Sequence, residues 1–265
     1  MDIYTLGIDI GSTASKAVIL KNGAEIIAHH VVFLGAGTEG PDNVIEHLFK
    51  EANLDWDQIS FTVATGYGRN TYKKADDQIS ELSCHSRGAT FLHPSVRTVI
   101  DIGGQDAKAL KIGENGKLSN FLMNDKCAAG TGRFLEVMSR VLNIPIEEFS
   151  ERSLMSTQKV EISSTCTVFA ETEVISYLAN AVKREDILAG VHRSIASRVG
   201  ALAQRVGLEE EVLLTGGVAH DKGIVRALEE ALGVPVHTNE YCQLNGALGA
   251  ALYGYQLFRK EKGMN

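Results

Sequence analysis

An internal repeat is the feature that most restricts how this chain of 265 residues can fold. The segment Asp9–Ala17, which reads DIGSTASKA, recurs as Asp101–Ala109, which reads DIGGQDAKA, with Asp, Ile, Gly, Lys and Ala in register. An apolar run precedes each copy and another follows it. Asn-Gly at residues 22–23 and at residues 115–116 then marks a hairpin turn before a third apolar segment. The repeat therefore predicts a meander of three strands that occurs twice in the chain.

Downstream of each meander the chain continues on the same plan. Residues 61–66 and 212–217 both read as strands that end in Thr-Gly, and strands alternate with amphipathic helical patterns. Helices are expected at residues 42–52, 82–92, 133–142, 167–181, 185–206, 222–232 and 245–258. This order predicts a duplicated α/β chain. We expect a first lobe over residues 1–93, a second over residues 94–244, and a C-terminal helix (residues 245–265) that packs back on the first lobe.

Charge and composition narrow the classes of partner. Lys and Arg number 26 against 33 Asp and Glu, and this net charge of −7 argues against a general binder of nucleic-acid backbones. No apolar run approaches the ~18–20 residues of a membrane span, and the N-terminus lacks a basic-then-apolar leader. We therefore expect a cytoplasmic protein with no nucleic-acid or membrane partner. The 26 glycines with only 4 prolines favour tight turns or close approach of a ligand.

The two DIG segments have the composition of phosphate-binding turns. A strand that ends in Asp-Ile-Gly and then reverses exposes several backbone N–H groups, which can bind phosphate oxygens. Asp9 and Asp101 can hold Mg²⁺ through water, and Lys16 can neutralise phosphate charge. For one copy alone a simple hairpin turn explains the glycines equally well, but the duplication favours a nucleotide held by both turns. The residues assigned to the turns are Gly11, Ser12, Thr13, Ala14, Ser15, Lys16, Gly103, Gly104 and Gln105.

A further glycine pair suggests where the rest of a nucleotide binds. Gly216 and Gly217 follow a predicted strand and precede a helix, so an adenine or a ribose can lie close to the backbone there. Gln243 and Asn245 precede the last helix, and they either contact the same ligand or cap the helix. A P-loop is excluded because GxxxxGK[ST] does not occur. The GxGxxG spacing at residues 35–40 follows a meander strand instead of opening a βαβ unit, so it is expected to be a loop.

The four cysteines fall into two pairs. Cys127 and Cys166 precede helical patterns in polar surroundings, where a helix N-terminus favours a thiolate or an anionic cluster. Cys84 and Cys242 occupy matching places in the two halves and are expected to be structural. Two ligand thiols cannot complete the four-Cys ligand set of a cubane iron–sulfur cluster, but a two-fold homodimer can. Zinc across a dimer satisfies the same count, and reduced cysteines without a metal are the third alternative.

Eight motifs spread over most of the chain form a specific combination. They are GIDIGSTASK from Gly7, ATGYGRN from Ala64, QISELSCH from Gln78, DIGGQDAK from Asp101, MNDKCAAGTGRF from Met123, SSTCTVFAE from Ser163, TGGVA from Thr215 and NGALGAALY from Asn245. In these motifs the chain resembles the ATP-dependent activators of 2-hydroxyacyl-CoA dehydratases, relatives of the ATPase subunits of benzoyl-CoA reductase. Their superfamily of acetate and sugar kinases, heat-shock chaperones and actin implies a duplicated ribonuclease H-like, two-lobed ATPase.

The resemblance also implies a function. It implies an oxygen-sensitive homodimer with one [4Fe–4S] cluster bound by Cys127 and Cys166 of each subunit, and one ATP per subunit between the lobes. Such a protein takes an electron from ferredoxin or flavodoxin and delivers it to a separate 2-hydroxyacyl-CoA dehydratase while it hydrolyses ATP. On this hypothesis Asp9 and Asp101 organise Mg²⁺ and the attacking water, Gln105 is the third catalytic residue, and Gly132 joins the nucleotide-binding residues.

Two other functions fit part of the sequence. A small-molecule kinase on the same scaffold would transfer the γ-phosphoryl group to a sugar or an acid. It explains the glycine turns but leaves Cys127 and Cys166 without a role. A nucleotide-dependent assembly or chaperone module would use ATP only to change shape. About four irons per dimer would distinguish the activator from both, because a cubane cluster contains that number.

Overall fold

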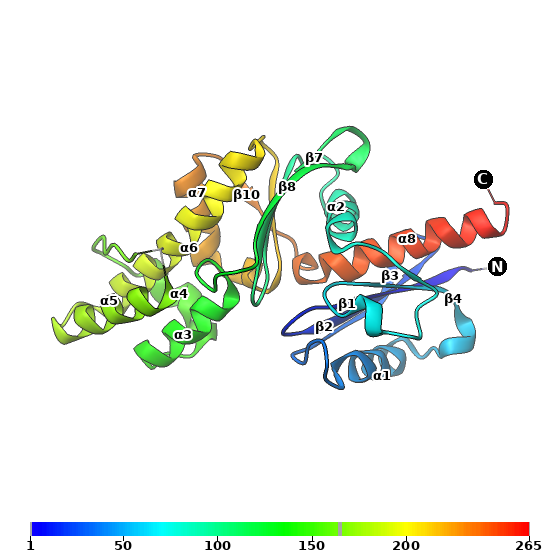
Figure 1. The fold of residues 1–265 in the computed structure, drawn as a ribbon, viewed down its shortest axis with the longest axis horizontal. Coiled ribbons are helices and arrows are strands. Elements are labelled where there is room, and N and C mark those ends of the chain that lie inside the picture. The colour runs from blue at the N-terminus through cyan, green and yellow to red at the C-terminus, as the bar shows by residue number, and fades with distance from the viewer. Residues whose placement is uncertain (1, 164–165, 265) are drawn as a thin grey trace. The chain divides into compact units, whose positions relative to one another are not determined.

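The computed structural model describes residues 2–163 and 166–264, and the chain divides into two compact units. The first unit comprises Met1–Pro94, Glu114–Leu118 and Gln243–Asn265, and the second comprises Ser95–Gly113 and Ser119–Cys242. Each unit is built around one five-stranded sheet (Figure 1). The C-terminal segment thus belongs to the first unit, although it is the last part of the chain.

The first sheet has the strand order β3-β2-β1-β4-β5. Its strands are β1 (Tyr4–Ile10), β2 (Ser15–Lys21), β3 (Glu25–Val32), β4 (Ile59–Thr65) and β5 (Asp77–Gln78). The first three are antiparallel, whereas β4 runs parallel to β1 and β5 parallel to β4. The register places Asp9 of β1 between Lys16 of β2 and Thr65 of β4.

The second sheet repeats this plan in the order β10-β9-β6-β7-β8. Its strands are β6 (Thr98–Ile102), β7 (Ala107–Ile112), β8 (Leu118–Asn124), β9 (Val212–Thr215) and β10 (Val236–His237). Asp101 of β6 lies between Lys108 of β7 and Thr215 of β9, which matches the register around Asp9. The equal strand order and register confirm the predicted duplicated α/β fold.

Both Asn-Gly pairs form the predicted hairpin turns. Asn22 and Gly23 have φ angles of 54° and 67°, and Asn115 and Gly116 have φ angles of 64° and 69°. This left-handed backbone at two successive positions is what a type I′ turn requires, and Asn and Gly are the residues that tolerate it best.

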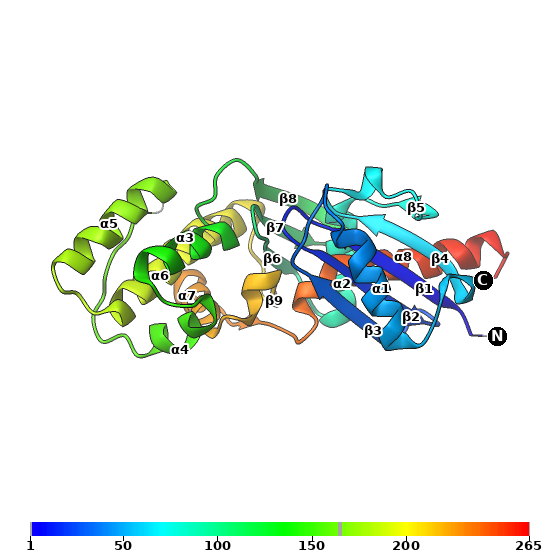
Figure 2. The same cartoon turned by 90° about the horizontal axis from the view of Figure 1, so that it is seen from below.

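Helices cover both faces of the first sheet (Figures 1 and 2). They are α1 (Gly40–Ala52), α2 (Glu81–Leu92) and α8 (Asn245–Glu261). Helix α1 packs on β2 and β3, while α8 packs on β1, β4 and α2. Glycines allow α8 to approach this closely: a Cβ on Gly7 would overlap the backbone of Ala247 and Ala251, and one on Gly249 would overlap the carbonyl group of Cys84.

The second unit has most of its helices inserted between β8 and β9. Its helices are α3 (Gly132–Leu142), α4 (Phe149–Leu154), α5 (Thr167–Ala179), α6 (Arg184–Val206) and α7 (Lys222–Leu232). Helix α6 packs on β7 and α7, α3 packs on α5, and α4 packs on both α6 and α7. This insertion is the main departure from the plan of the first unit.

The structure differs from the sequence prediction in short elements. Helix α4 and strands β5 and β10 were not predicted, because they are too short to display a hydrophobic period. Helix α5 ends at Ala179 and not at residue 181, since Ala181 has a φ of 56°, which is outside the helical region. Among the described residues, the helices lack the combination of length and apolar character that crossing a membrane requires.

Candidate functional site

The first DIG turn joins β1 to β2 and leaves backbone donors available. The N–H of Gly11 donates to the carbonyl oxygen of Ala14 at 3.0 Å and closes the turn. The N–H groups of Ser12 and Thr13 have no hydrogen-bond partner within residues 2–163 and 166–264. The hydroxyl of Ser15 donates to the carbonyl oxygen of Leu34 at 2.8 Å, so this side chain anchors the turn. Two adjacent N–H donors beside a cationic lysine form an anion-binding arrangement.

The second DIG turn has the same geometry. The N–H of Gly103 donates to the carbonyl oxygen of Asp106 at 2.9 Å, as Gly11 does to Ala14 in the first turn. The N–H groups of Gly104 and Gln105 have no partner in the described parts of the chain, and the Gln105 side chain is exposed. The two turns therefore present equivalent backbone donors.

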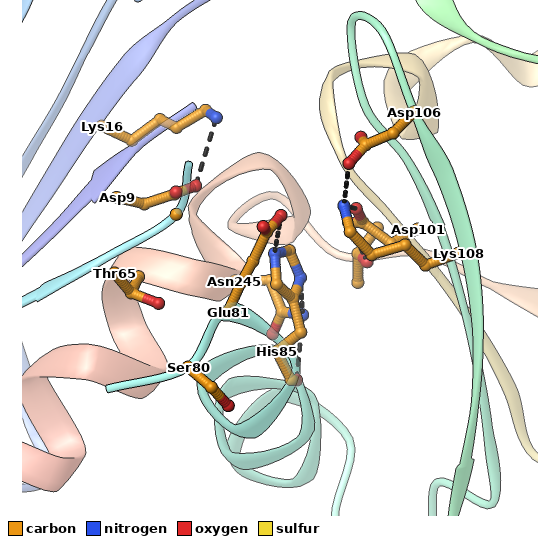
Figure 3. A network of polar contacts seen from close by, with 12 residues as sticks. Asp9, Lys16, Thr65, Ser80, Glu81, His85, Asp101, Asp106, Lys108 and Asn245 are labelled. Atoms are coloured by element: carbon orange, nitrogen blue, oxygen red, sulfur yellow. Dashed lines mark hydrogen bonds and ion pairs between the residues drawn. The ribbon is translucent and has the colours of Figure 1, made fainter. Parts of the chain in front are cut away.

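Asp9 lies buried in the first unit with glycines packed closely around its carboxylate. The Nζ of Lys16 lies 3.2 Å from Oδ2 of Asp9 (Figure 3). A Cβ on Gly246 would lie 3.0 Å from the same oxygen, and one on Gly66 would overlap the other oxygen. Gly66 also has a φ of 82°, which favours glycine. The side of the carboxylate that faces these glycines is thus closed to larger side chains.

Asp101 is held by more partners than Asp9. The hydroxyl of Thr215 donates to its Oδ1 at 2.7 Å, and the Nζ of Lys108 lies 3.4 Å from its Oδ2 (Figure 3). Lys108 also pairs with Oδ2 of Asp106 at 2.7 Å. The Lys108 side chain is 2% exposed and faces two carboxylates, whereas Lys16 is 17% exposed and faces one. Lys16 is therefore the better placed of the two lysines to bind phosphate.

The sequence motifs did not indicate a role for Lys108, Asp106 or Thr215. The register of the repeat could have identified Lys108, because it occupies the position of Lys16. Asp106 replaces Ala14 of the first turn, and this single difference supplies the second carboxylate around Lys108.

Asn245 joins α8 to α2 in the first unit. Its Nδ2 donates to the carbonyl oxygen of His85 at 3.1 Å and lies 3.2 Å from Nδ1 of that ring (Figure 3). The other ring nitrogen lies 3.7 Å from Oε1 of Glu81. Of the two alternatives for Asn245, the helix cap is wrong, because Leu244 occupies the cap position of α8 and Asn245 is inside the helix.

The glycine pair after β9 forms a tight turn. Gly216 has a φ of 90°, and a Cβ there would overlap the carbonyl group of Ile102. Its N–H donates to the carbonyl oxygen of Cys242 at 3.1 Å. Gly217 begins a short 3₁₀ helix that precedes α7, and Gln243, in the first unit, is half-buried. The glycine at 216 is thus required by the backbone whether or not a ligand lies near it.

Cys127 lies in a loop between β8 and α3 that side chains hold in shape. The Nδ2 of Asn124 donates to the carbonyl oxygens of Cys127 and Ala129 at 2.8 and 3.1 Å. The hydroxyl of Thr131 donates to the carbonyl oxygen of Ala128 at 2.7 Å. The thiol is partly exposed and not in a disulfide.

The start of α3 is bonded directly to the second DIG turn. The N–H of Gly132 donates to the carbonyl oxygen of Gly103 at 2.9 Å, and that of Arg133 donates to Gly104 at 2.8 Å. These bonds satisfy two helix N–H groups that have no partner inside the helix. They also connect the turn to the helix that follows the Cys127 loop.

Cys166 caps α5 at its N-terminus and is partly exposed. Ser164 and Thr165, which precede it in the SSTC motif, lie outside the described residues. Helix α5 packs on α3, so the helices that follow Cys127 and Cys166 contact each other. Cys84 and Cys242 are buried, and burial raises the pKa of the Cys84 thiol to about 12. The four thiols are therefore divided into two accessible and two buried ones.

Known proteins match nearly the full length of the chain. Residues 6–254 match the BadF/BadG/BcrA/BcrD ATPase family. The (R)-2-hydroxyglutaryl-CoA dehydratase activating ATPase of Acidaminococcus fermentans is 56% identical, over 97% of this chain and 98% of that protein. The solved structure of the activator of the 2-hydroxyisocaproyl-CoA dehydratase from Clostridium difficile, with bound ADPNP, has a TM-score of 0.96 and 52% identity, and the match covers 98% of this chain and 97% of that one.

A more distant match concerns the fold alone. A ROK family glucokinase from Streptomyces griseus, solved with glucose and AMPPNP, has a TM-score of 0.60 at 14% identity, over 96% of this chain and 99% of that chain. This likeness and the match to the activator structure confirm the expected duplicated, two-lobed α/β fold. The resemblance to dehydratase activators found in the motifs is also confirmed by the high identity of the relatives. The chain belongs to the BadF/BadG/BcrA/BcrD ATPase family.

Proposed function

We propose that this protein is an ATP-hydrolysing activator that passes a low-potential electron from ferredoxin or flavodoxin to a 2-hydroxyacyl-CoA dehydratase. The names of its relatives support the activator role, and the ADPNP bound to one of them supports ATP as the nucleotide. The electron carrier, the dehydratase and the reducing, oxygen-free cytoplasm in which they would work together are parts of the same proposal.

ATP would be bound through the two DIG turns. The N–H groups of Ser12 and Thr13 in one turn, and of Gly104 and Gln105 in the other, are available to phosphate oxygens. Lys16 would add a positive charge. The carboxylates of Asp9 and Asp101 fit Mg²⁺, which prefers oxygen ligands and retains several waters. When bound, Mg²⁺ would neutralise the charge that develops on the phosphates during hydrolysis.

Gln105 would orient the attacking water or contact the γ-phosphate, since its side chain is exposed beside the N–H donors of the second turn. The carboxylate that accepts the proton of this water would be Asp9 or Asp101. The glycine pair at residues 216–217 and the side chain of Gln243 would contact the nucleoside. Gly132 would act indirectly, because its N–H is bonded to the second turn.

Cys127 and Cys166 fit as ligands of an iron–sulfur cluster. Their thiols are the two that are partly exposed, and two thiols are half of the four that a [4Fe–4S] cluster takes. A two-fold homodimer would supply the other half. Next to Cys166, the first turns of α5 expose Val168 and Phe169, an apolar surface that a second copy of the chain would cover. When bound, the cluster would store and release one electron.

The observation that carries the proposal is the pair of bonds from α3 to the second DIG turn. Because Gly132 and Arg133 donate to Gly103 and Gly104, a shift of this turn on binding or losing phosphate would move the start of α3. The loop with Cys127 precedes this helix directly. Hydrolysis could thereby alter the surroundings of a metal held by this cysteine.

Anaerobic purification tests the proposal. We expect a brown homodimer with about four irons per dimer that reduces a dehydratase only while ATP is hydrolysed. Cys166→Ser should lose the iron and keep ATP binding, whereas Asp101→Asn should keep the iron and lose hydrolysis. Cys242→Ser is the matched control and should keep both. A colourless protein that phosphorylates a sugar or an acid would support the kinase alternative instead.

A further inference from the structure

The second unit contains a cavity of about 330 Å³ that the proposed function does not use. It lies where α4, α6 and α7 meet the segment of residues 156–159. Among the described residues, its lining includes none from the two DIG turns, from the glycine pair at 216–217 or from the exposed cysteines. The cavity is therefore a candidate for a separate ligand.

Positive charge predominates in the lining. Lys159, Arg193 and Arg226 line the cavity, and Glu230 is the carboxylate in its lining. The Nζ of Lys159 pairs with Oε1 of Glu161, outside the lining, at 3.1 Å. The Nε of Arg226 donates to Glu230 at 3.0 Å, one helical turn away on α7. Two of the three cationic side chains come from different helices, α6 and α7, so the positive charge converges on the cavity from two sides. An anion is the ligand that such a lining favours.

The guanidinium groups retain donors for a ligand. Nη2 of Arg193 donates to the carbonyl oxygen of Val160 at 3.0 Å, but its Nε is buried and has no partner in the described part of the chain. The Nη atoms of Arg226 likewise have no partner there. A buried N–H without an acceptor costs free energy, so an oxyanion bound beside Arg193 would recover that cost.

A buried histidine adds a further unpartnered polar atom to the lining. His192 is 1% exposed, and its Nε2 lies 3.2 Å from Oδ2 of Asp221, which caps α7. Its Nδ1 has no hydrogen-bond partner within the described residues. A Cβ on Gly223 would overlap both this nitrogen and the hydroxyl of Ser153. The wall of the cavity is thus polar and tightly packed.

The loop beside the cavity is held in a fixed shape. The carboxylate of Asp186 accepts hydrogen bonds from the N–H groups of Thr157 and Gln158, at 2.7 and 2.8 Å, and from the hydroxyl of Ser156 at 2.9 Å. These donors are therefore not available to a ligand. Recognition therefore depends on Arg193 and Arg226.

We propose that this cavity binds a small organic phosphate, with Arg193 and Arg226 as the groups that hold its phosphate. The planar guanidinium group matches phosphate oxygens in a bidentate manner, and Arg193 has no carboxylate partner within the described residues, so its charge is available to an anion. The volume is at the lower end of the range for small-molecule sites and leaves room for a few carbon atoms beyond the phosphate. This inference goes beyond the ATP-dependent function and does not depend on the cluster or the dehydratase.

Calorimetric titration of the intact, anaerobically purified protein tests the inference. The protein is first saturated with Mg²⁺ and ADPNP, so that the nucleotide site is filled, and is then titrated with inorganic phosphate and with glycerol 3-phosphate. We expect saturable binding of both, at least tenfold weaker in Arg226→Gln. Arg205→Gln is the matched control, since Arg205 is also an exposed helical arginine but lies outside the cavity lining, and it should bind like the unaltered protein.

Three results would overturn the inference that the cavity is a separate anion site. They are the absence of saturable phosphate binding in the unaltered protein, equal affinities in Arg226→Gln and Arg205→Gln, and binding that occurs without ADPNP but disappears when ADPNP is present. The last result would assign the phosphate to the nucleotide site. Binding of succinate as tight as that of glycerol 3-phosphate would overturn the choice of phosphate as the ligand class.

Discussion

The hydroxyl of Thr215 donates a 2.7 Å hydrogen bond to Oδ1 of Asp101 and so ties the end of β9 to the end of β6. The matching residue of the first unit, Thr65, also lies beside the repeated aspartate in the sheet, but its hydroxyl donates to the carbonyl oxygen of Ile79. The two aspartates of the repeat are therefore held differently, although their strands have the same register.

Removal of this hydroxyl should affect both stability and hydrolysis. Thr215→Val leaves a buried carboxylate oxygen without its donor, and the free energy of unfolding should fall by about 1–3 kcal/mol. ATP hydrolysis should fall as well, because Asp101 loses one of the contacts that position its carboxylate. Chemical denaturation and an ATPase assay measure the two effects. Thr215→Ser retains the hydroxyl and should resemble the unaltered protein; equal losses in both variants would contradict the prediction.

The two lysines of the repeat should differ in what they contribute. Lys108→Met leaves the buried carboxylate of Asp101 and the partly exposed carboxylate of Asp106 without the cation that they share, which should cost about 3–5 kcal/mol of stability. Lys16→Met removes a more exposed cation that faces one carboxylate, so it should weaken ATP binding more than it lowers stability. Denaturation curves and nucleotide titrations of both variants check this. A larger loss of stability in Lys16→Met would disprove it.

Two glycine-to-alanine changes should have opposite effects on stability. In Gly7→Ala the new Cβ overlaps backbone atoms of Ala247 and Ala251, which cannot move without displacing α8 from β1. We expect a loss of about 1–3 kcal/mol from this overpacking. In Gly200→Ala the Cβ meets Leu232 at an ordinary 3.4 Å inside α6, so helix propensity should raise stability by about 0.5–1 kcal/mol. Thermal unfolding of both variants gives the comparison.

The four cysteine thiols should differ in how readily they are alkylated. In the metal-free folded protein, iodoacetamide should alkylate Cys127 and Cys166, which are partly exposed, and spare Cys84 and Cys242, which are buried. Burial raises the pKa of Cys84 to about 12, so this thiol stays protonated at neutral pH and is a poor nucleophile. Peptide mass spectrometry identifies the modified residues, and denatured protein, in which all four should react, is the control. Alkylation of Cys84 in the folded protein would contradict the prediction.

Asp186 should make the free energy of unfolding depend on pH in the acidic range. Burial raises its pKa, but hydrogen bonds from Gln158, Thr157 and Ser156 outweigh burial, and the pKa of the folded state is lowered. The contribution of Asp186 to the free energy of unfolding is therefore complete above the pKa of about 3.9 that an aspartate has in the unfolded chain. It disappears as the pH falls through the lower pKa of the folded state. Asp186→Asn should be less stable than the unaltered protein at neutral pH, and this difference should shrink below about pH 4. Urea denaturation across this pH range measures it; a constant difference would refute the assignment.

Local features of the chain were predictable because they depend on near neighbours. Turn chemistry predicts the Asn-Gly hairpins. The strands on either side of each DIG turn and the long helices are predicted by the spacing of apolar residues, which a short stretch of sequence already shows. The closed turn at Gly11 and its copy at Gly103 needed nothing more than the repeated motif. Elements such as α4 and β10 escaped prediction because they contain too few residues for a period.

The duplication, the two DIG turns and the division of the cysteines could be predicted from the amino-acid sequence, since each depends on a contiguous motif. The tertiary structure selects the partners of those motifs: Thr215 contacts Asp101 across 114 residues of sequence, and Asn245 contacts His85 across 160. It also decided that Lys108 is neutralised while Lys16 is more exposed. Such contacts depend on which strands and helices become neighbours after folding, and burial of apolar surface over the whole unit, not local preference, selects those neighbours.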